Sequence, residues 1–168
     1  MRRIQIQHLE GSVAQSFVER LLMFECTVCI DASHFESYSE RYEAILATGL
    51  SSIEASANAD TCFSFFNQEN IVTVESEGLI SQIRLHDVLP TGSNTGLKHI
   101  FLEQLWNQKE SSHQATGMYY WVSESDVVDA LVRIALHSPT LPDIVDIAGR
   151  RGWLAQQTID EFSMLWQR

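Results

Sequence analysis

Residues 3–31 have the sequence RIQIQHLEGSVAQSFVERLLMFECTVCID, in which three patterns follow one another. The segment IQIQ alternates apolar and polar residues, as a half-buried strand does. The apolar residues that follow have the spacing of one helix face: Val13, Phe17, Leu21 and Phe24. CTVCID is a β-rich run that ends at Asp31. Since strands joined through a helix pair in parallel, this stretch predicts a βαβ unit.

The composition is that of a folded globular protein of one domain. Of 168 residues, 45% are hydrophobic and 20% are charged, which excludes a disordered chain. The formal net charge of −11 disfavours binding to nucleic acid, because it repels phosphate backbones. The apolar runs are too short for a membrane span or a signal peptide. We therefore expect a cytoplasmic protein that contacts neither nucleic acid nor membrane.

Alternating strand and helix patterns continue along the chain. RYEAILATGLSSIEASA (41–57) has helical spacing, whereas the polar segment before it reads as a connection. Further helices are predicted over 97–108, over 123–138 with Ser123 or Ser125 as cap, and over 155–167. TCFSFF (61–66), LISQIRLHDV (79–88), MYYWVS (118–123) and DIVDIAG (143–149) are predicted strands. We find no internal repeat and no interdomain linker.

Three cysteines and scattered histidines give no metal-ligand pattern. Cys26 and Cys29 are three apart within a strand pattern, so their side chains point to opposite faces. We expect these residues and Cys62 to be buried or half-buried thiols rather than a redox or zinc pair. No His-x-x-x-His or Asp-rich loop occurs, and no metal site is predicted.

Four segments, in order along nearly the whole chain, resemble the extended short-chain dehydrogenase/reductase family, the nucleotide-sugar epimerases and dehydratases. The segments are IQHLEGSVAQSFVERLL (6–22), QIRLHDVLPTGSNTG (82–96), WVSESDVVDALVRIAL (121–136) and DIVDIAGRRGWLAQQTIDEF (143–162). The resemblance implies one Rossmann-like domain, with a nucleotide-binding-like core (1–97) and a C-terminal α/β subregion (98–168) similar to the family's substrate part.

Two departures from the family pattern affect these expectations. Between Asp31 and Ser39 there is no room for the family's further strand–helix units, so we expect a shortened, mainly parallel sheet of four to six strands flanked by helices. The family's catalytic helix carries Tyr-x-x-x-Lys after a Ser or Thr, but residues 63–79 contain neither Tyr nor Lys. The proton-transfer residues of the family are therefore missing.

The turn after the first strand departs from a dinucleotide-binding turn. His8 stands at the family's first glycine, Gly11 keeps the second, and Ala14 replaces the third. The carboxylate of Glu10 would lie beside the phosphates, and like charges about 4 Å apart repel by roughly 1 to 4 kcal/mol. Our hypothesis is that Glu10 itself supplies the negative charge at the helix end. We expect no cofactor.

A bound NAD or NADP, if there were one, would contact this same unit. Its phosphates would lie on the helix N-terminus at Gly11, Ser12 and Val13. Asp31 stands where the family's acid bonds the adenosine ribose, although an acid after a strand is also a common cap or turn residue.

The other polar residues fit a structural role as well as a functional one. Ser64, His86 and Asp87 could form a nucleophilic set, but no nucleophile elbow surrounds Ser64. Arg84 either faces the active-site side or forms a buried ion pair. Asp126 is expected to cap a helix or hold a loop. Aromatic residues concentrate in the last third, where a shortened sheet would expose some of them: Tyr119, Tyr120, Trp121, Trp153 and Trp166.

These observations leave several functions open. The first is a non-catalytic protein that acts by binding, as a homo-oligomer or with another protein, because a shortened sheet exposes an edge or face. The alternative is an NAD(P)-dependent enzyme on a nucleotide-linked sugar that uses Tyr42, His86 and Asp87 as unconventional acid and base groups. A third is a regulator whose pocket senses a nucleotide or redox ligand without converting it.

Overall fold

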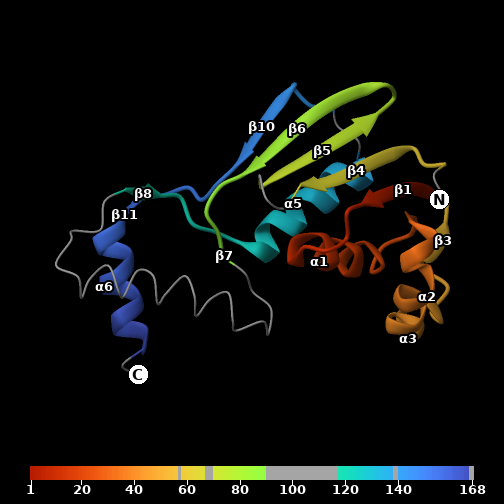
Figure 1. Ribbon diagram of the computed structural model, residues 1–168, viewed down its shortest axis with the longest axis horizontal. Helices are drawn as coiled ribbons and strands as arrows, with labels where there is room; N and C mark the ends of the chain where they lie inside the picture. Colours follow the sequence, from red (N-terminus) through yellow and green to blue (C-terminus); the bar gives the residue numbers. More distant parts are fainter. Residues whose placement is uncertain (57, 67–69, 90–116, 138–139, 167–168) are drawn as a thin grey trace. The chain divides into compact units, whose positions relative to one another are not determined.

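The computed structural model describes residues 1–56, 58–66, 70–89, 117–137 and 140–166 (Figure 1). Its residues form two compact units. The first comprises Met1–Leu85 and Ser125–Ile147, and the second comprises His86–Glu124 and Ala148–Arg168. This division differs from the sequential one expected from the sequence, because a helix and a strand from the second half of the chain join the first unit.

The first unit is built on a seven-stranded sheet. Its strands are β1 (Arg2–Gln7), β2 (Cys26–Ile30), β3 (Ser52–Ala55), β4 (Thr61–Phe66), β5 (Ile71–Ser76), β6 (Leu79–Leu85) and β10 (Ile144–Ile147). Their order is β10-β6-β5-β4-β1-β2-β3. Four neighbouring pairs are parallel, whereas β5 is antiparallel to both β4 and β6. The predicted mainly parallel α/β sheet is confirmed, with seven strands rather than four to six.

The opening βαβ unit forms as the sequence predicts. Helix α1 (Ser12–Leu21) connects β1 to β2, and the two strands are parallel. Its buried face consists of Ala14, Phe17, Val18 and Leu21. Phe24 lies beyond the helix and is partly exposed.

Residues 32–55 differ from the expectation. The polar segment forms α2 (Ala32–Arg41), followed by the short α3 (Glu43–Leu46) and by β3. The predicted helix over 41–57 is therefore wrong, and there is room after Asp31 for a helix and a further strand. Ile53 is the buried residue of β3, and a single buried position in four residues gives little periodic signal.

Strand β5 is the second element that the sequence analysis missed. Four residues (67–70) connect β4 to β5, and two residues, Glu77 and Gly78, connect β5 to β6. Both Glu77 (φ 54°) and Gly78 (φ 76°) are left-handed, as in a type I′ hairpin turn. Two hairpins therefore join β4 to β6, where a parallel sheet would use crossover helices.

The core of this unit lies between the sheet and two helices, α1 and α5 (Glu124–His137), on the same side of the sheet (Figure 1). The Phe17 ring lies 4.9 Å from that of Phe63 and 5.7 Å from that of Phe65. Arg20 and Asp129 join the two helices at 2.7 Å. Helix α5 was predicted correctly, and the expected cap residue Ser123 directly precedes it.

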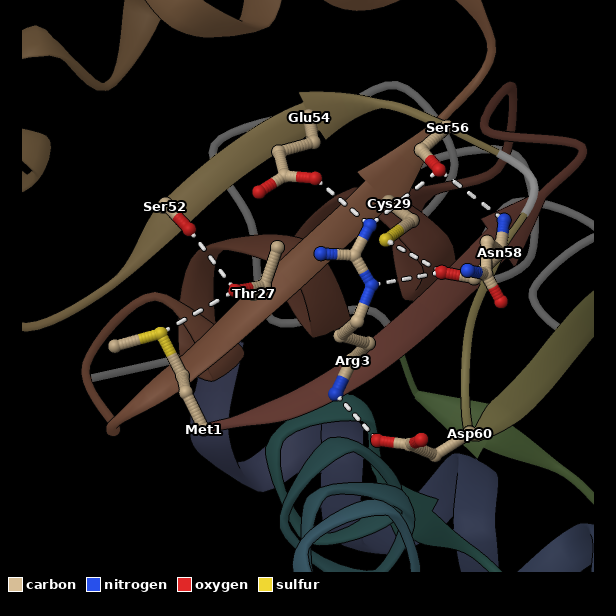
Figure 2. A network of polar contacts seen from close by, with 9 residues as sticks. All are labelled: Met1, Arg3, Thr27, Cys29, Ser52, Glu54, Ser56, Asn58 and Asp60. Atoms are coloured by element: carbon tan, nitrogen blue, oxygen red, sulfur yellow. Dashed lines mark hydrogen bonds and ion pairs between the residues drawn. The ribbon is translucent and has the colours of Figure 1, made fainter.

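Arg3 is the centre of a polar network that ties the connection between β3 and β4 to the sheet (Figure 2). Its guanidinium donates to Glu54 Oε2 at 2.7 Å and to the Asn58 carbonyl oxygen at 2.8 Å. The Arg3 amide donates to Asp60 Oδ2 at 2.9 Å, and Cys29 Sγ donates to the Asn58 carbonyl oxygen. Strands β3 and β4 are not neighbours, because β1 and β2 lie between them. The short connection from β3 to β4 must therefore cross these two strands, and the network holds it in place.

The described residues of the second unit form two small sheets and a helix. Strands β7 (Val88–Leu89) and β9 (Val122–Ser123) are parallel, whereas β8 (Met118–Tyr119) and β11 (Trp153–Leu154) are antiparallel. Thus the predicted strand over 118–123 is two short strands. Helix α6 (Ala155–Trp166) forms as predicted, and the Trp121 indole donates to Thr158 Oγ1 at 3.1 Å. The helix predicted over 97–108 lies outside the described residues.

Candidate functional site

The candidate site is the turn between β1 and α1, at the carboxyl ends of β1 and β4. In open α/β sheets, ligands bind at this edge, where the strand order reverses. Here β1 is that point, because β2 and β4 lie on its two sides. Gly11 is the N-cap residue of α1 and provides no side-chain cap. The turn holds its shape through the buried Leu9, whose carbonyl oxygen accepts a hydrogen bond from Gln15 Nε2 at 3.4 Å.

His8 keeps the backbone geometry that a glycine would adopt in this turn. Its φ of 60° is left-handed, a conformation that costs a non-glycine residue about 1 kcal/mol. Its ring lies 5.5 Å from the Phe66 ring at the end of β4. The imidazole therefore extends from the end of β1 to the end of β4, along the edge where a dinucleotide would cross. Phe66 was missed by the sequence analysis, because only the pairing of β1 with β4 brings it next to the turn.

Glu10 lies in the turn but does not cap the helix. It is exposed, no acidic residue stands in the first turn of α1, and the helix has no side-chain cap. Burial raises the pKa of Tyr38 on α2, with a smaller contribution from the negative charge of Glu10 and an opposing one from Arg41. The proposed compensation of the α1 dipole by Glu10 stays a prediction.

Asp31, the candidate ribose-binding residue, follows β2 directly and is the N-cap residue of α2. Its side chain is exposed and forms no capping hydrogen bond. Asp31 therefore occupies the cap position while its carboxylate stays accessible. Ser12 and Val13, the other predicted contacts, form the first turn of α1.

The candidate acid and base groups belong to different units. Tyr42 joins α2 to α3 in the first unit and is 5% exposed; within the described residues its hydroxyl has no hydrogen-bond partner. Burial raises the pKa of Tyr42. His86 and Asp87 belong to the second unit, where Asp87 Oδ2 accepts the Tyr120 amide at 2.7 Å.

The remaining polar candidates are engaged in the sheet. Ser64 Oγ donates to Gln7 Oε1 at 2.9 Å. Arg84 pairs with Asp146 through two hydrogen bonds of 2.8 Å, which raise the pKa of Arg84. Each side chain of this pair is 47% exposed, so the ion pair exists but is not buried. Asp126, the proposed structural acid, lies in the first turn of α5.

The cysteines are free, with Cys26 and Cys29 buried and Cys62 half-buried, which confirms the prediction of buried thiols. Cys26 Sγ donates to the Leu21 carbonyl oxygen at 3.3 Å, and burial raises the pKa of this thiol to about 11. Within the described part of the chain, no three His, Cys, Asp or Glu residues are arranged to hold a metal ion. The helices described there also lack the length and apolar character that a bilayer crossing requires.

Comparison with known proteins shows the fold. No family model matches the sequence, and no curated protein matches it significantly. One similar solved structure is described as "Structure of a novel NAD dependent-NDP-hexosamine 5,6-dehydratase, TunA, involved in tunicamycin biosynthesis". The match has a TM-score of 0.51 at 11% identity, and it covers 99% of this chain and 82% of that chain. The chain therefore has a Rossmann-like α/β fold that it shares with this dehydratase.

Proposed function

We propose that this chain is a non-catalytic protein with an epimerase/dehydratase-like fold that acts by binding to itself or to another protein. The observation that carries the proposal is the pair of hairpins between β4 and β6. Strand β5 pairs with β4 in the part of the chain where the family that this sequence resembles has a helix with Tyr-x-x-x-Lys. Ser64, the hydroxyl residue near the end of β4, bonds to Gln7 instead of an acid or base.

Weakened dinucleotide binding is part of this proposal. The His8 ring against Phe66 occupies the edge between the Asp31 side and the β4 side of the turn. A dinucleotide that bridges the two sides would have to displace this ring. Glu10 adds a negative charge beside the place of the phosphates.

The test measures ligand, mass and turnover on the purified full chain. We expect no nicotinamide absorbance in the purified protein, no micromolar NADH or NADPH binding, and no NAD-dependent conversion of nucleotide-linked hexosamines. A mass in solution above 19.1 kDa would support binding through self-association. Micromolar cofactor binding together with turnover would contradict the proposal.

A second candidate is an NAD-dependent enzyme on a nucleotide-linked sugar, with NAD or NADP as cofactor. It is favoured by the uncapped α1 terminus beside the exposed Asp31, an arrangement that suits a phosphate and a ribose. The variant Tyr42→Phe separates the candidates, because any turnover that depends on the Tyr42 hydroxyl would fall at least tenfold. Ser37→Ala, on the exposed surface of α2, is the control and should leave turnover unchanged.

A further inference from the structure

One side of the sheet in the first unit carries no helix among the described residues. Phe63 and Phe65 of β4 contact α1, and because side chains alternate along a strand, Ser64 points to the opposite side. Residues paired directly across strands share a face, which extends this side over five strands. We call the following three rows the open face: Cys62–Glu75–Ile80, Gln7–Ser64–Thr73–Gln82–Ile144, and Phe66–Ile71–Arg84–Asp146.

The open face combines apolar residues with uncharged polar ones. Ile80 is 61% exposed, Ile144 is 50% exposed and Phe66 is 42% exposed. Gln, Ser and Thr side chains make up the rest of the row that ends at Ile144. Parallel strands such as β6 and β10, which carry Ile80 and Ile144, are normally covered on both sides, and large apolar residues exposed there mark a contact surface.

The charge of this face differs from that of the whole chain. Its charged residues are Glu75, Arg84 and Asp146, and the last two neutralise each other at 2.8 Å. The face thus has a net charge of about −1, while the chain has −11. Two copies repel each other across most of their surfaces, but not here. A basic partner, in contrast, would be drawn to the acidic surfaces elsewhere.

We propose that the open face packs against the open face of a second copy, giving a homodimer with two stacked sheets. This inference rests on the proposed binding function and names its surface and partner. Sheets stacked in this way lie about 10 Å apart, with their side chains interdigitated. The contact is isologous, since each copy contributes the same rows.

The size of the face sets the strength of the dimer. Five strands spaced about 4.8 Å apart, with six residues of about 3.3 Å each, cover on the order of 500 Å² per copy. The pair then buries about 1,000 Å², near the lower limit for a specific interface. We therefore expect a dissociation constant in the micromolar range. Higher salt should lower that constant, because it screens the repulsion between two acidic copies.

The experiment is sedimentation equilibrium of the full chain over a range of micromolar concentrations, with three variants. Gln82→Arg and Thr73→Arg place a cation in the central row of the open face, and Gln82 is exposed enough to tolerate the change in a monomer. Thr48→Arg, at an exposed position after α3, is the matched control. Circular dichroism and thermal unfolding verify that each variant is folded.

We expect the wild type and Thr48→Arg to dimerise from 19.1 kDa to twice that mass, and both face variants to raise the dissociation constant at least tenfold. A wild type that stays monomeric overturns the inference, as does a dimer that folded Gln82→Arg and Thr73→Arg leave intact. A dimer that both folded face variants leave intact would overturn the proposed surface but would still agree with the proposed binding function. Cofactor binding with turnover would remove that function whichever surface dimerises.

Discussion

The double variant His8→Gly with Glu10→Gln tests whether the turn excludes a dinucleotide. Glycine relieves the left-handed strain at φ 60°, about 1 kcal/mol, but its freedom in the unfolded chain costs about 0.5 to 1 kcal/mol. Loss of the ring contact with Phe66 costs about 0.5 kcal/mol, the lower end for aromatic pairs, because both rings are exposed. These terms nearly cancel, and so the variant should unfold within about 1 kcal/mol of the wild type.

The two substitutions change the affinity for NADH in the same direction. Removing the exposed Glu10 carboxylate contributes about 1 kcal/mol, or roughly fivefold in affinity, and removing the imidazole opens the path between Asp31 and β4. We expect NADH to bind at least tenfold more tightly to the double variant, as measured by fluorescence titration. Asn70→Gly is the control, since Asn70 is also left-handed (φ 51°) but lies outside the turn. A folded double variant that binds NADH no better than the wild type would refute the reasoning.

Three further predictions concern stability. Phe17→Ala should lower the free energy of unfolding by about 3 to 5 kcal/mol in urea titrations, because the ring packs on two buried rings of β4; a loss below 1 kcal/mol would contradict this packing. The raised pKa of Cys26 means that the folded state holds its proton longer, so stability should fall as pH rises from about 9 to about 11. Cys26→Ala should flatten that slope, and an unchanged slope would show another group to be responsible. Gly149→Ala would place a Cβ 2.0 Å from the Trp121 carbonyl oxygen, so hydrogen exchange should quicken over residues 118–123, and unchanged protection would argue against the described approach.

The sequence predicts those elements whose apolar spacing extends over several turns or a continuous run. The βαβ unit and α5 fall in this class, since each buries a full stripe or a continuous strand. Strand β3 has only one buried residue, so it has no periodic pattern from which to predict it. Strand β5 does have alternating buried residues, Val72 and Val74, but it was missed because this region was compared with a helix of the family. At the site, the turn and Asp31 could be located from local pattern. The contact between His8 and Phe66 could not, because it depends on the pairing of two strands distant in sequence.

The hairpins also explain how one side of the sheet carries no helix within the described part of the chain. A crossover helix would bury apolar side chains against that side, and without one those positions must tolerate water or a partner. The central row meets this condition with Gln7, Ser64, Thr73 and Gln82, whose polar groups can bond to water or to each other, as Ser64 and Gln7 do. Ile80 and Ile144 near the β10 edge do not meet it. Water can therefore satisfy the polar centre of the face, whereas its apolar margin is where the proposed second copy would pack. For this reason we expect the proposed dimer to be reversible rather than obligate.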